Sequence, residues 1–495
     1  MKYRAPRGTA LLVFCSALAV YTLTAGGSLT STDAVVTFDL TASLVERHSI
    51  ALTENVLGLD ANRGVDGRVY SQYGIGQSLY NIPFYLAGKA AMRLAPRRIG
   101  KPDTLLKAAV AMGSAVAAAL TVWLIWGVSR RLGASSQGAF VAALTAALSS
   151  PLWPYSKFGF STALTAAILA AAARLLVEAV GRAQARYAAA AGAVLAFGWL
   201  TRHEMAVVLL PFVGALALGA RESGRRFPWN SVAALLGTTC VGGLIWAWYN
   251  TVRFGSPLFV GYSPLLDFSG YAAFLVSPAG SVFVFAPIII AWAIGLSDAR
   301  FSRSSRVLLA GPLVVFFAFY GALADWPGGR SYGPRYLVPA LVLLAPGAAA
   351  WWDASRAKRQ LIGLACVVAA VLQLPGVLVD YAKVSTDWAR SHTREEVAQR
   401  NWRWPSSPLV LNTEAAFEAV PANVAFLSGV REPPRVATTS TASNRDFAQQ
   451  LSFSLDFWWL YLVYLHAIRP AVAALIAATL CGIAAVSARM AWSSG

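Results

Sequence analysis

Positions 104–128 read TLLKAAVAMGSAVAAALTVWLIWGV, an apolar run that contains a single charged residue, Lys107. A helix needs about 20 mostly apolar residues to cross the hydrocarbon core of a bilayer, so this run predicts a transmembrane helix. Similar runs recur along the chain and predict an all-α polytopic membrane protein of about 12 transmembrane helices. The predicted spans are 9–29, 104–128, 137–151, 158–180, 186–201, 204–220, 229–251, 279–297, 306–324, 336–352, 360–380 and 457–487.

The composition favours a membrane protein over a soluble one. Hydrophobic residues make up 57% of the 495 residues and charged residues 13%, whereas soluble domains average about 45–50% apolar and about 25% charged residues. A soluble chain this apolar could not cover its own surface. The formal net charge is +18, but Lys and Arg lie in short loops between apolar runs, as the positive-inside rule predicts. Nucleic acid is therefore not expected as a partner.

The arginine-rich loops predict which span ends share a side of the membrane. The clusters Arg130/Arg131, Arg182/Arg186, Arg221/Arg225/Arg226, Arg300/Arg303/Arg306 and Arg356/Lys358/Arg359 are each separated by two predicted spans. They therefore lie on one side, which the positive-inside rule makes cytoplasmic. Keeping the basic N-terminus on that side requires an even number of crossings before Arg130. The ambiguous segment 74–95 is accordingly predicted to be an interfacial or re-entrant helix on the outer face.

This topology leaves two long segments outside, 30–103 and 381–456. In the first, AVVTFDLTASLVERHSIAL (34–52) mixes apolar and charged positions in the manner of a helix that lies on a membrane surface. The second is polar and aromatic and is expected to form an extracytoplasmic loop or small cap. The predicted organisation is a transmembrane region (1–380), this outer segment (381–456), and a C-terminal transmembrane helix with a cytoplasmic tail (457–495).

Acids, arginines and aromatics recur at the outer ends of the predicted helices. The segments are STDAVVTFD (31–39), GVDGRVYSQYGIGQSLYNIPFYLAG (64–88), LTRHE (200–204), YNTVRFGSPLFVGY (249–262), LVSPAGSVFVFAP (275–287) and WPGGRSYGPRYLVPAL (326–341). In this order and spacing they resemble the GT-C superfamily of membrane glycosyltransferases. The resemblance is to the bacterial families similar to protein O-mannosyltransferases and to the aminoarabinose transferase that acts on lipid A, and it covers most of residues 1–380.

The resemblance implies a polyprenyl-phosphate-linked sugar as donor and transfer, with inversion, on the outer face of the membrane. An acidic residue early in the first outer loop of the family acts as general base or positions the acceptor, and Asp33 occupies that place here. The family often has two adjacent acids there, whereas Ala34 follows Asp33 in this chain. Any acidic partner must then come from Asp39, Glu46 or Asp66.

Transfer of a sugar from a polyprenyl phosphate to a hydroxyl requires the residue types found in these segments. A base must take a proton from the acceptor hydroxyl, and the arginine fork suits two oxygens of a phosphate leaving group. The expected phosphate ligands are Arg335, Arg202 and Arg253, and the expected substrate contacts are Tyr70, Tyr73, His203, Glu204 and Tyr332. The residues specify no particular cofactor and leave a divalent metal ion open, for which Asp33 with Asp39 or Glu46 would be able to supply ligands.

Each candidate also has a plain structural interpretation. Asp33 can be a helix cap, Asp66-Gly67 a turn, Tyr70 and Tyr73 interfacial aromatics, and Arg335 a snorkelling arginine. Trp326 is expected to anchor the chain at the membrane interface.

Two other functions stay open at this point. A transporter or flippase of a lipid-linked saccharide would place ionisable residues in mid-membrane, often on broken helices, whereas these acids cluster in loops. A polymerase or ligase of long glycans would differ only in its acceptor. The expected location is the inner (plasma) membrane, with membrane lipids, the lipid-linked sugar and an envelope lipid, glycan or protein as partners.

Overall fold

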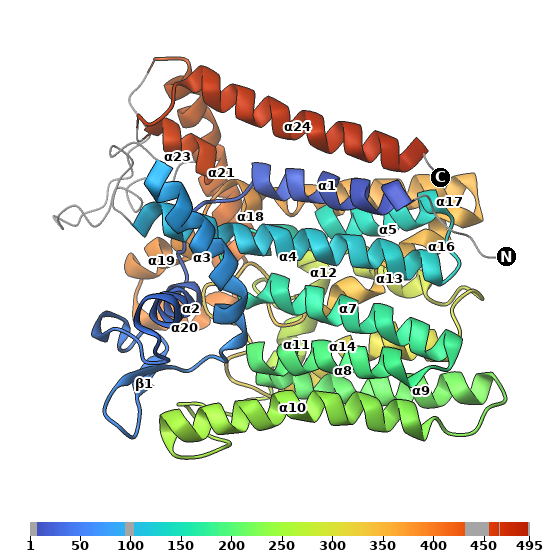
Figure 1. Ribbon diagram of the computed structural model, residues 1–495. Helices are drawn as coiled ribbons and strands as arrows, with labels where there is room; N and C mark the ends of the chain where they lie inside the picture. Colours follow the sequence, from blue (N-terminus) through green and yellow to red (C-terminus); the bar gives the residue numbers. More distant parts are fainter. Residues whose placement is uncertain (1–6, 95–102, 431–454, 465, 494–495) are drawn as a thin grey trace.

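Long helices packed side by side form the body of the protein (Figure 1). The computed structural model describes residues 7–94, 103–430, 455–464 and 466–493. Its long helices are α1 (Arg7–Leu23), α4 (Asp103–Arg131), α5 (Ser136–Leu148), α7 (Ser161–Arg182), α8 (Ala185–Thr201), α9 (Leu209–Glu222), α10 (Trp229–Phe254), α14 (Arg303–Gly321), α17 (Arg356–Val371) and α24 (Pro470–Ser493). The prediction of an all-α architecture is confirmed: β structure in the described residues is limited to one short antiparallel pair, β1 (Ala61–Arg63) with β2 (Val69–Ser71), and an isolated bridge between Leu266 and Leu323.

Shorter helices connect or interrupt the long ones. They are α6 (Leu152–Tyr155), the 3₁₀ helix η3 (His203–Val208), α11 (Ser269–Val276), α12 (Val282–Phe285), α13 (Ile288–Gly295), α15 (Val338–Leu341), η4 (Val342–Leu344), α16 (Pro346–Ala354) and α18 (Leu374–Leu378). Proline explains some of the breaks, because it lacks a backbone N–H and disfavours helix in the residue before it. Pro287 separates α12 from α13, and Pro346 begins α16.

Within the described residues, six helices are long and apolar enough to cross a membrane: Leu105–Arg131, Ser161–Arg182, His203–Glu222, Trp229–Phe254, Arg303–Gly321 and Pro470–Ser493. The count of twelve spans therefore stays a prediction. The prediction of one continuous helix over 457–487 is wrong. The chain forms α23 (Trp458–Tyr464) and then starts a new helix at Pro470, where proline suits the first helical turn.

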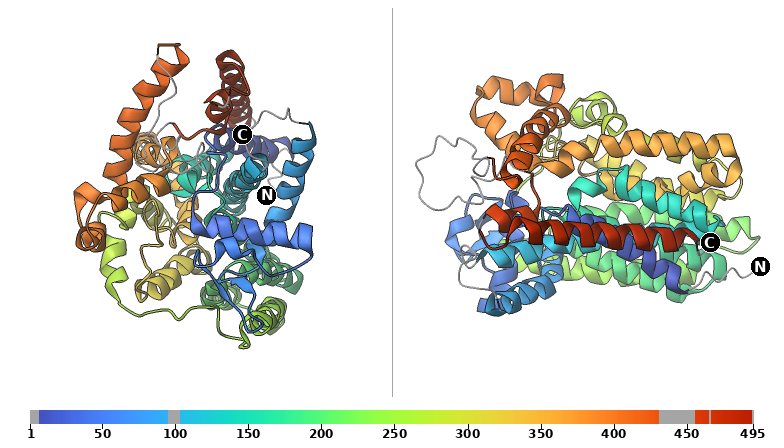
Figure 2. Two further views of the ribbon diagram at one scale, coloured as in Figure 1. Left: turned by 90° about the vertical axis from the view of Figure 1, so that its left-hand side faces the viewer. Right: turned by 90° about the horizontal axis from the view of Figure 1, so that it is seen from above.

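The two ends of the helix bundle differ in charge and in structure. The start of α1 and the end of α24 lie at one end (Figures 1 and 2). The arginine-rich loops after α4, between α9 and α10 and between α16 and α17 lie at the same end. The parity argument therefore groups these loops correctly, and their assignment to the cytoplasm stays a prediction.

The opposite end carries the segments predicted to lie outside. The first contains α2 (Thr32–Ala42), the π-helix η1 (Ser43–Arg47), η2 (Glu54–Val56), β1, β2 and α3 (Gly76–Leu94). Helix α3, the ambiguous segment of the sequence, lies across the bundle end and not along it (Figure 1). The second segment contains α19 (Tyr381–Arg390), α20 (Arg394–Gln399), η5 (Arg400–Trp402), η6 (Trp404–Ser406) and α21 (Pro408–Leu427). We call residues 381–427 the cap; the rest of the predicted outer segment up to residue 454 lies largely outside the described residues.

This arrangement predicts that positions 54 and 390 face one side of the membrane and position 225 the other. Glu54, Arg390 and Arg225 are exposed, so single cysteines there should be accessible. In a variant without the native cysteines, an impermeant maleimide applied to spheroplasts should label Glu54→Cys and Arg390→Cys, while Arg225→Cys should react only after lysis. Labelling of Arg225→Cys alone would invert the topology.

Candidate active site

Asp33 lies in the first turn of α2, directly after the predicted first span. Ser31 caps the helix, since its hydroxyl accepts a hydrogen bond of 3.2 Å from the Ala34 backbone N–H. A carboxylate near a helix N-terminus is stabilised by the partial positive charge of that end. The Thr37 hydroxyl donates to the Asp33 carbonyl oxygen at 2.9 Å. The local sequence therefore fixes the backbone that carries this carboxylate.

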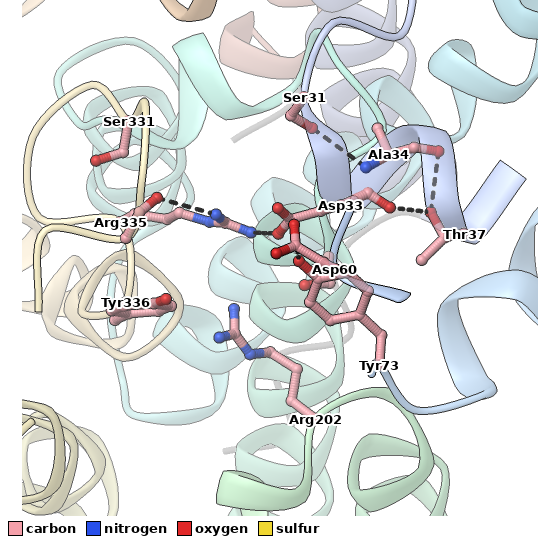
Figure 3. A network of polar contacts seen from close by, with 12 residues as sticks. Ser31, Asp33, Ala34, Thr37, Asp60, Tyr73, Arg202, Ser331, Arg335 and Tyr336 are labelled. Carbon is pink, nitrogen blue, oxygen red and sulfur yellow. Dashed lines mark hydrogen bonds and ion pairs between the residues drawn. The ribbon is translucent and has the colours of Figure 1, made fainter. Parts of the chain in front are cut away.

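Asp33 forms an ion pair with Arg335, a residue 302 positions later in the chain (Figure 3). Arg335 Nη2 donates to Asp33 Oδ2, and Nη1 donates to the Gly328 carbonyl oxygen at 3.1 Å. The guanidinium also lies over the Phe160 ring, 4.2 Å from its centroid. The Arg335 side chain is 6% exposed and that of Asp33 is 18% exposed. Arg335 is thus buried with a paired carboxylate, which does not fit a snorkelling arginine.

The ion pair sets the protonation of both partners. Burial raises the pKa of Asp33, but the charge and hydrogen bond of Arg335 lower it more, so the net pKa lies below the usual range. Burial lowers the pKa of Arg335, and the Asp33 charge more than offsets this. Both residues are therefore charged at neutral pH.

The pair lies on the wall of a cavity of about 490 Å³, a volume in the range of small-molecule sites. The start of α2, the connection from β2 to α3, the α8–η3 junction, the end of α14 and the Gly-rich loop before α15 all contribute to its lining. Its charged residues are Asp33, Asp60, Arg202, Glu204, Asp325 and Arg335.

Arg202 stands at the break between α8 and η3, where an extended backbone (φ −146°, ψ 117°) turns its side chain toward the cavity. Its guanidinium lies 4.9 Å from the centroid of the Tyr336 ring, a cation–π distance. Glu204 accepts hydrogen bonds from Arg202 Nη2 at 3.2 Å and from the Tyr320 hydroxyl at 2.9 Å. Tyr320 in turn stacks on Tyr336 with centroids 4.4 Å apart. These contacts fix Arg202 on the cavity wall.

Two acids in the cavity were missed by the sequence reasoning. Asp60 accepts a hydrogen bond of 2.9 Å from the Tyr73 hydroxyl and has a left-handed backbone (φ 60°), which is rare for a residue other than glycine. Asp325 accepts from the Tyr336 hydroxyl at 2.8 Å, and burial raises its pKa. The one available signal was position: Asp60 lies in the first outer loop, and Asp325 directly precedes the motif WPGGRSYGPRY.

Comparison with known proteins bears on the fold that carries this cavity. The family model of dolichyl-phosphate-mannose-protein mannosyltransferases matches residues 105–246. The solved structure of ArnT from Cupriavidus metallidurans in the apo state matches with a TM-score of 0.51 and 16% sequence identity, over 97% of this chain and 76% of that chain. The chain has the GT-C fold.

A second ArnT structure from the same organism, bound to undecaprenyl phosphate, also has a TM-score of 0.51 and 16% identity, over 94% of this chain and 87% of that chain. A search of curated proteins gives no match. Sequence identity this low establishes a shared fold and leaves the chemistry to be argued from the cavity residues.

The GT-C fold brings together part of the predicted set. Asp33, Tyr73, Arg202, His203, Glu204 and Arg335 all line the cavity. His203 also stacks on Trp246, with ring centroids 5.6 Å apart.

The three acids predicted as partners of Asp33 lie elsewhere in the GT-C fold. Asp39 accepts from the Thr53 N–H at 2.8 Å and from its hydroxyl at 3.1 Å. Glu46 binds Lys89 Nζ at 2.7 Å, and Asp66 accepts from the Tyr70 hydroxyl at 2.8 Å. Each therefore fixes a local loop or helix contact. The acid that shares the cavity wall beside Asp33 is Asp60 (Figure 3).

Three further predicted residues also belong to the framework. Tyr70 binds Asp66 and packs its ring edge on Phe254. Tyr332 is fully buried, and its hydroxyl donates to the Leu372 carbonyl oxygen. Arg253 is fully buried in α10, and Nη1 donates to the carbonyl oxygens of Ser71 and Tyr73. Its guanidinium holds the β2–α3 connection in place and does not reach the cavity lining.

A metal ligand set was also considered in the sequence. Asp39 accepts a hydrogen bond from Thr53, and Glu46 binds Lys89. Neither carboxylate lies beside Asp33 to form a shared ligand set. No group of three or more His, Cys, Asp or Glu residues suited to a metal ion occurs in the part of the chain that the structure describes.

The position of Arg253 predicts a structural role. Arg253→Ala would leave the Ser71 and Tyr73 carbonyl oxygens without their donor, and an unsatisfied buried polar group costs about 1–3 kcal/mol. We expect a lower midpoint of thermal unfolding in detergent. Arg68→Ala, between β1 and β2, is the control. Arg68 is exposed and its ion pair with Asp66 is long, at 3.6 Å, so the midpoint should be unchanged. An unchanged midpoint together with lost phosphate binding in Arg253→Ala would show instead that Arg253 acts in the binding site.

Proposed function

We propose that the protein is a glycosyltransferase that moves a sugar from a polyprenyl-phosphate carrier to an envelope acceptor, with inversion, on the extracytoplasmic face. The observation that carries the proposal is the Asp33–Arg335 pair on a cavity that also presents Arg202. A carboxylate base and two arginines are the groups that this transfer needs. The fold supports the proposal, because the ArnT of the same fold has been solved with undecaprenyl phosphate bound.

The two arginines would hold the carrier phosphate. Arg335 already binds one anion, Asp33, through Nη2, and its Nε is buried without a hydrogen-bond partner among the described residues. A phosphate oxygen at this guanidinium would satisfy donors that are otherwise unpaired, in the bidentate geometry that arginine favours. Arg202, fixed by Glu204 and Tyr336, would supply the second positive charge.

Donor binding would at the same time prepare the base. With Arg335 paired to it, Asp33 has a lowered pKa and is a weak proton acceptor. A phosphate that competes for Arg335 removes part of this stabilisation, while burial, which raises the pKa, remains. Asp33 would then take the acceptor's hydroxyl proton as the hydroxyl oxygen forms a bond to the anomeric carbon. The bond from that carbon to the phosphate oxygen breaks, and polyprenyl phosphate leaves with the electron pair.

The distribution of charges favours an enzyme over a transporter. The interrupted helices α12–α13 and α15–η4–α16 are the elements on which a transporter would place mid-membrane ionisable residues. In these described helices the only ionisable residue is Asp353, close to the C-terminal end of α16. The cavity carboxylates and arginines instead gather at the end of the bundle that carries the outer segments (Figure 1).

The role of Asp33 predicts a loss of turnover without a loss of donor affinity. Asp33→Asn keeps the size of the side chain but removes proton acceptance, so kcat should fall about 100-fold or more while binding of undecaprenyl phosphate is retained. Assays of purified protein with a defined polyprenyl-phosphate sugar would measure both. Asp39→Asn, outside the cavity, is the matched control. Near-normal transfer by Asp33→Asn would disprove the assignment, and wild-type movement of the donor across liposomes without any transfer would establish the transporter instead.

The role of Arg335 predicts weaker phosphate binding. Loss of a charged hydrogen bond costs about 1.5–3 kcal/mol, or roughly 10- to 150-fold in affinity. Arg335→Ala should raise the Kd for undecaprenyl phosphate by this factor, and Arg335→Lys, which keeps the charge but not the two-pronged geometry, should lie between. Unchanged affinity and turnover in Arg335→Ala, in a correctly inserted protein, would mean that this arginine only supports the fold.

A further inference from the structure

The cap contacts the rest of the outer end through three consecutive residues of η5, and two of them, Arg400 and Trp402, contact the loop from Trp326 to Arg335. Arg400 Nη2 donates to the Gly329 carbonyl oxygen at 3.2 Å. The Asn401 carbonyl oxygen accepts a hydrogen bond from the Ser277 hydroxyl. The Trp402 ring packs against Trp326, with centroids 6.1 Å apart and planes at 64°. Trp326 is 4% exposed, so it belongs to this contact and is not the interface anchor expected from the sequence.

The loop between Trp326 and Arg335 is held from two sides. Arg335 donates to the Gly328 carbonyl oxygen, and Arg400 donates to that of Gly329. Both glycines have left-handed backbones, with φ of 66° and 73°, a conformation that is costly for other residues. A Cβ on Gly328 would lie 3.2 Å from Arg335 Cδ. A movement of the peptide between the two arginines would therefore shift the Gly328 carbonyl that Arg335 binds.

Arg400 makes contacts that differ from those of an ordinary surface arginine. Its second donor, Nη1, binds the Ser385 hydroxyl on α19 at 3.0 Å, so the side chain bridges the cap helix and the loop. Among the described residues these two are its hydrogen-bond acceptors, and neither is a carboxylate. Arg403, three residues later in the cap, donates to Gln399 instead and stays within the cap.

We propose that Arg400 is a positioning residue of the active site: by holding the Gly329 carbonyl it keeps Arg335 aligned with Asp33 and with the carrier phosphate. The inference rests on the proposed function for the identity of that phosphate. It assigns the cap a part in donor binding, although no cap residue lines the cavity. Small displacements of a binding group lower rates and affinities by up to about 100-fold.

A double-mutant cycle with Arg335 tests this coupling. Arg400→Ala should raise the Kd for undecaprenyl phosphate about 10-fold in the wild-type background and less than about 2-fold in the Arg335→Ala background, because a residue that acts through Arg335 has nothing left to align. Arg400→Lys, which retains one donor for Gly329, should recover part of the affinity. Arg403→Ala is the matched control and should bind as the wild type does. Equal thermal unfolding midpoints would show that all variants are folded.

A spin label at position 330 gives a readout that does not depend on the donor. Arg330 is exposed and follows Gly329 directly, so a nitroxide on Arg330→Cys, in a variant without native cysteines, reports motion of the loop. Arg400→Ala should increase its mobility and Arg403→Ala should not. Wild-type affinity in Arg400→Ala, a penalty that adds fully to that of Arg335→Ala, or unchanged label mobility would each overturn the inference. If the wild type binds no undecaprenyl phosphate, the proposed function fails, and label mobility alone then decides whether the cap positions the loop.

Discussion

A single ion pair joins the first outer helix to the loop that precedes α15. Asp33 and Arg335 are 302 positions apart, and a charge removed from water must be paired to be tolerated. The pairing therefore depends on the contacts that place the two side chains. These are the Ser31 hydrogen bond at the start of α2, the Phe160 ring against the guanidinium, and the Gly328 carbonyl that accepts from Arg335. The contacts that Glu204 makes with Arg202 and Tyr320 surround the cavity beside this pair.

The long helices and the irregular segments have different roles in this fold. The long helices supply a frame, while each charged group of the cavity comes from a point where regular helix starts, stops or is absent. Asp33 follows a helix cap, Arg202 sits at a break between helices, and Asp60 has a left-handed backbone. Loops positioned by a rigid scaffold commonly carry function, because an interrupted helix frees side chains to converge from several directions.

The sequence predicted the frame better than the site. Apolar length alone specifies spanning helices, but prolines and short connections break several of them, and apolar composition does not reveal those breaks. At the site, the resemblance selected Asp33 and Arg335, which the structure joins. Acids of the first outer segment, such as Asp39, look the same in sequence whether they hold a neighbouring loop or face a cavity. Only the folded chain shows that Asp39 binds Thr53. Asp60 was missed for the same reason.

Asp33 and Arg335 compensate each other's charge, and this has a chemical consequence. The base and the leading phosphate ligand neutralise each other, so a carrier phosphate that competes for Arg335 would leave the charge of Asp33 less well compensated and would favour its protonation. Proton acceptance by Asp33 would then follow donor binding, not precede it. Arg335 can serve both partners only if its direction is fixed. The loop that sets this direction is also held by Arg400, so the requirement for alignment reaches from the cavity into the cap.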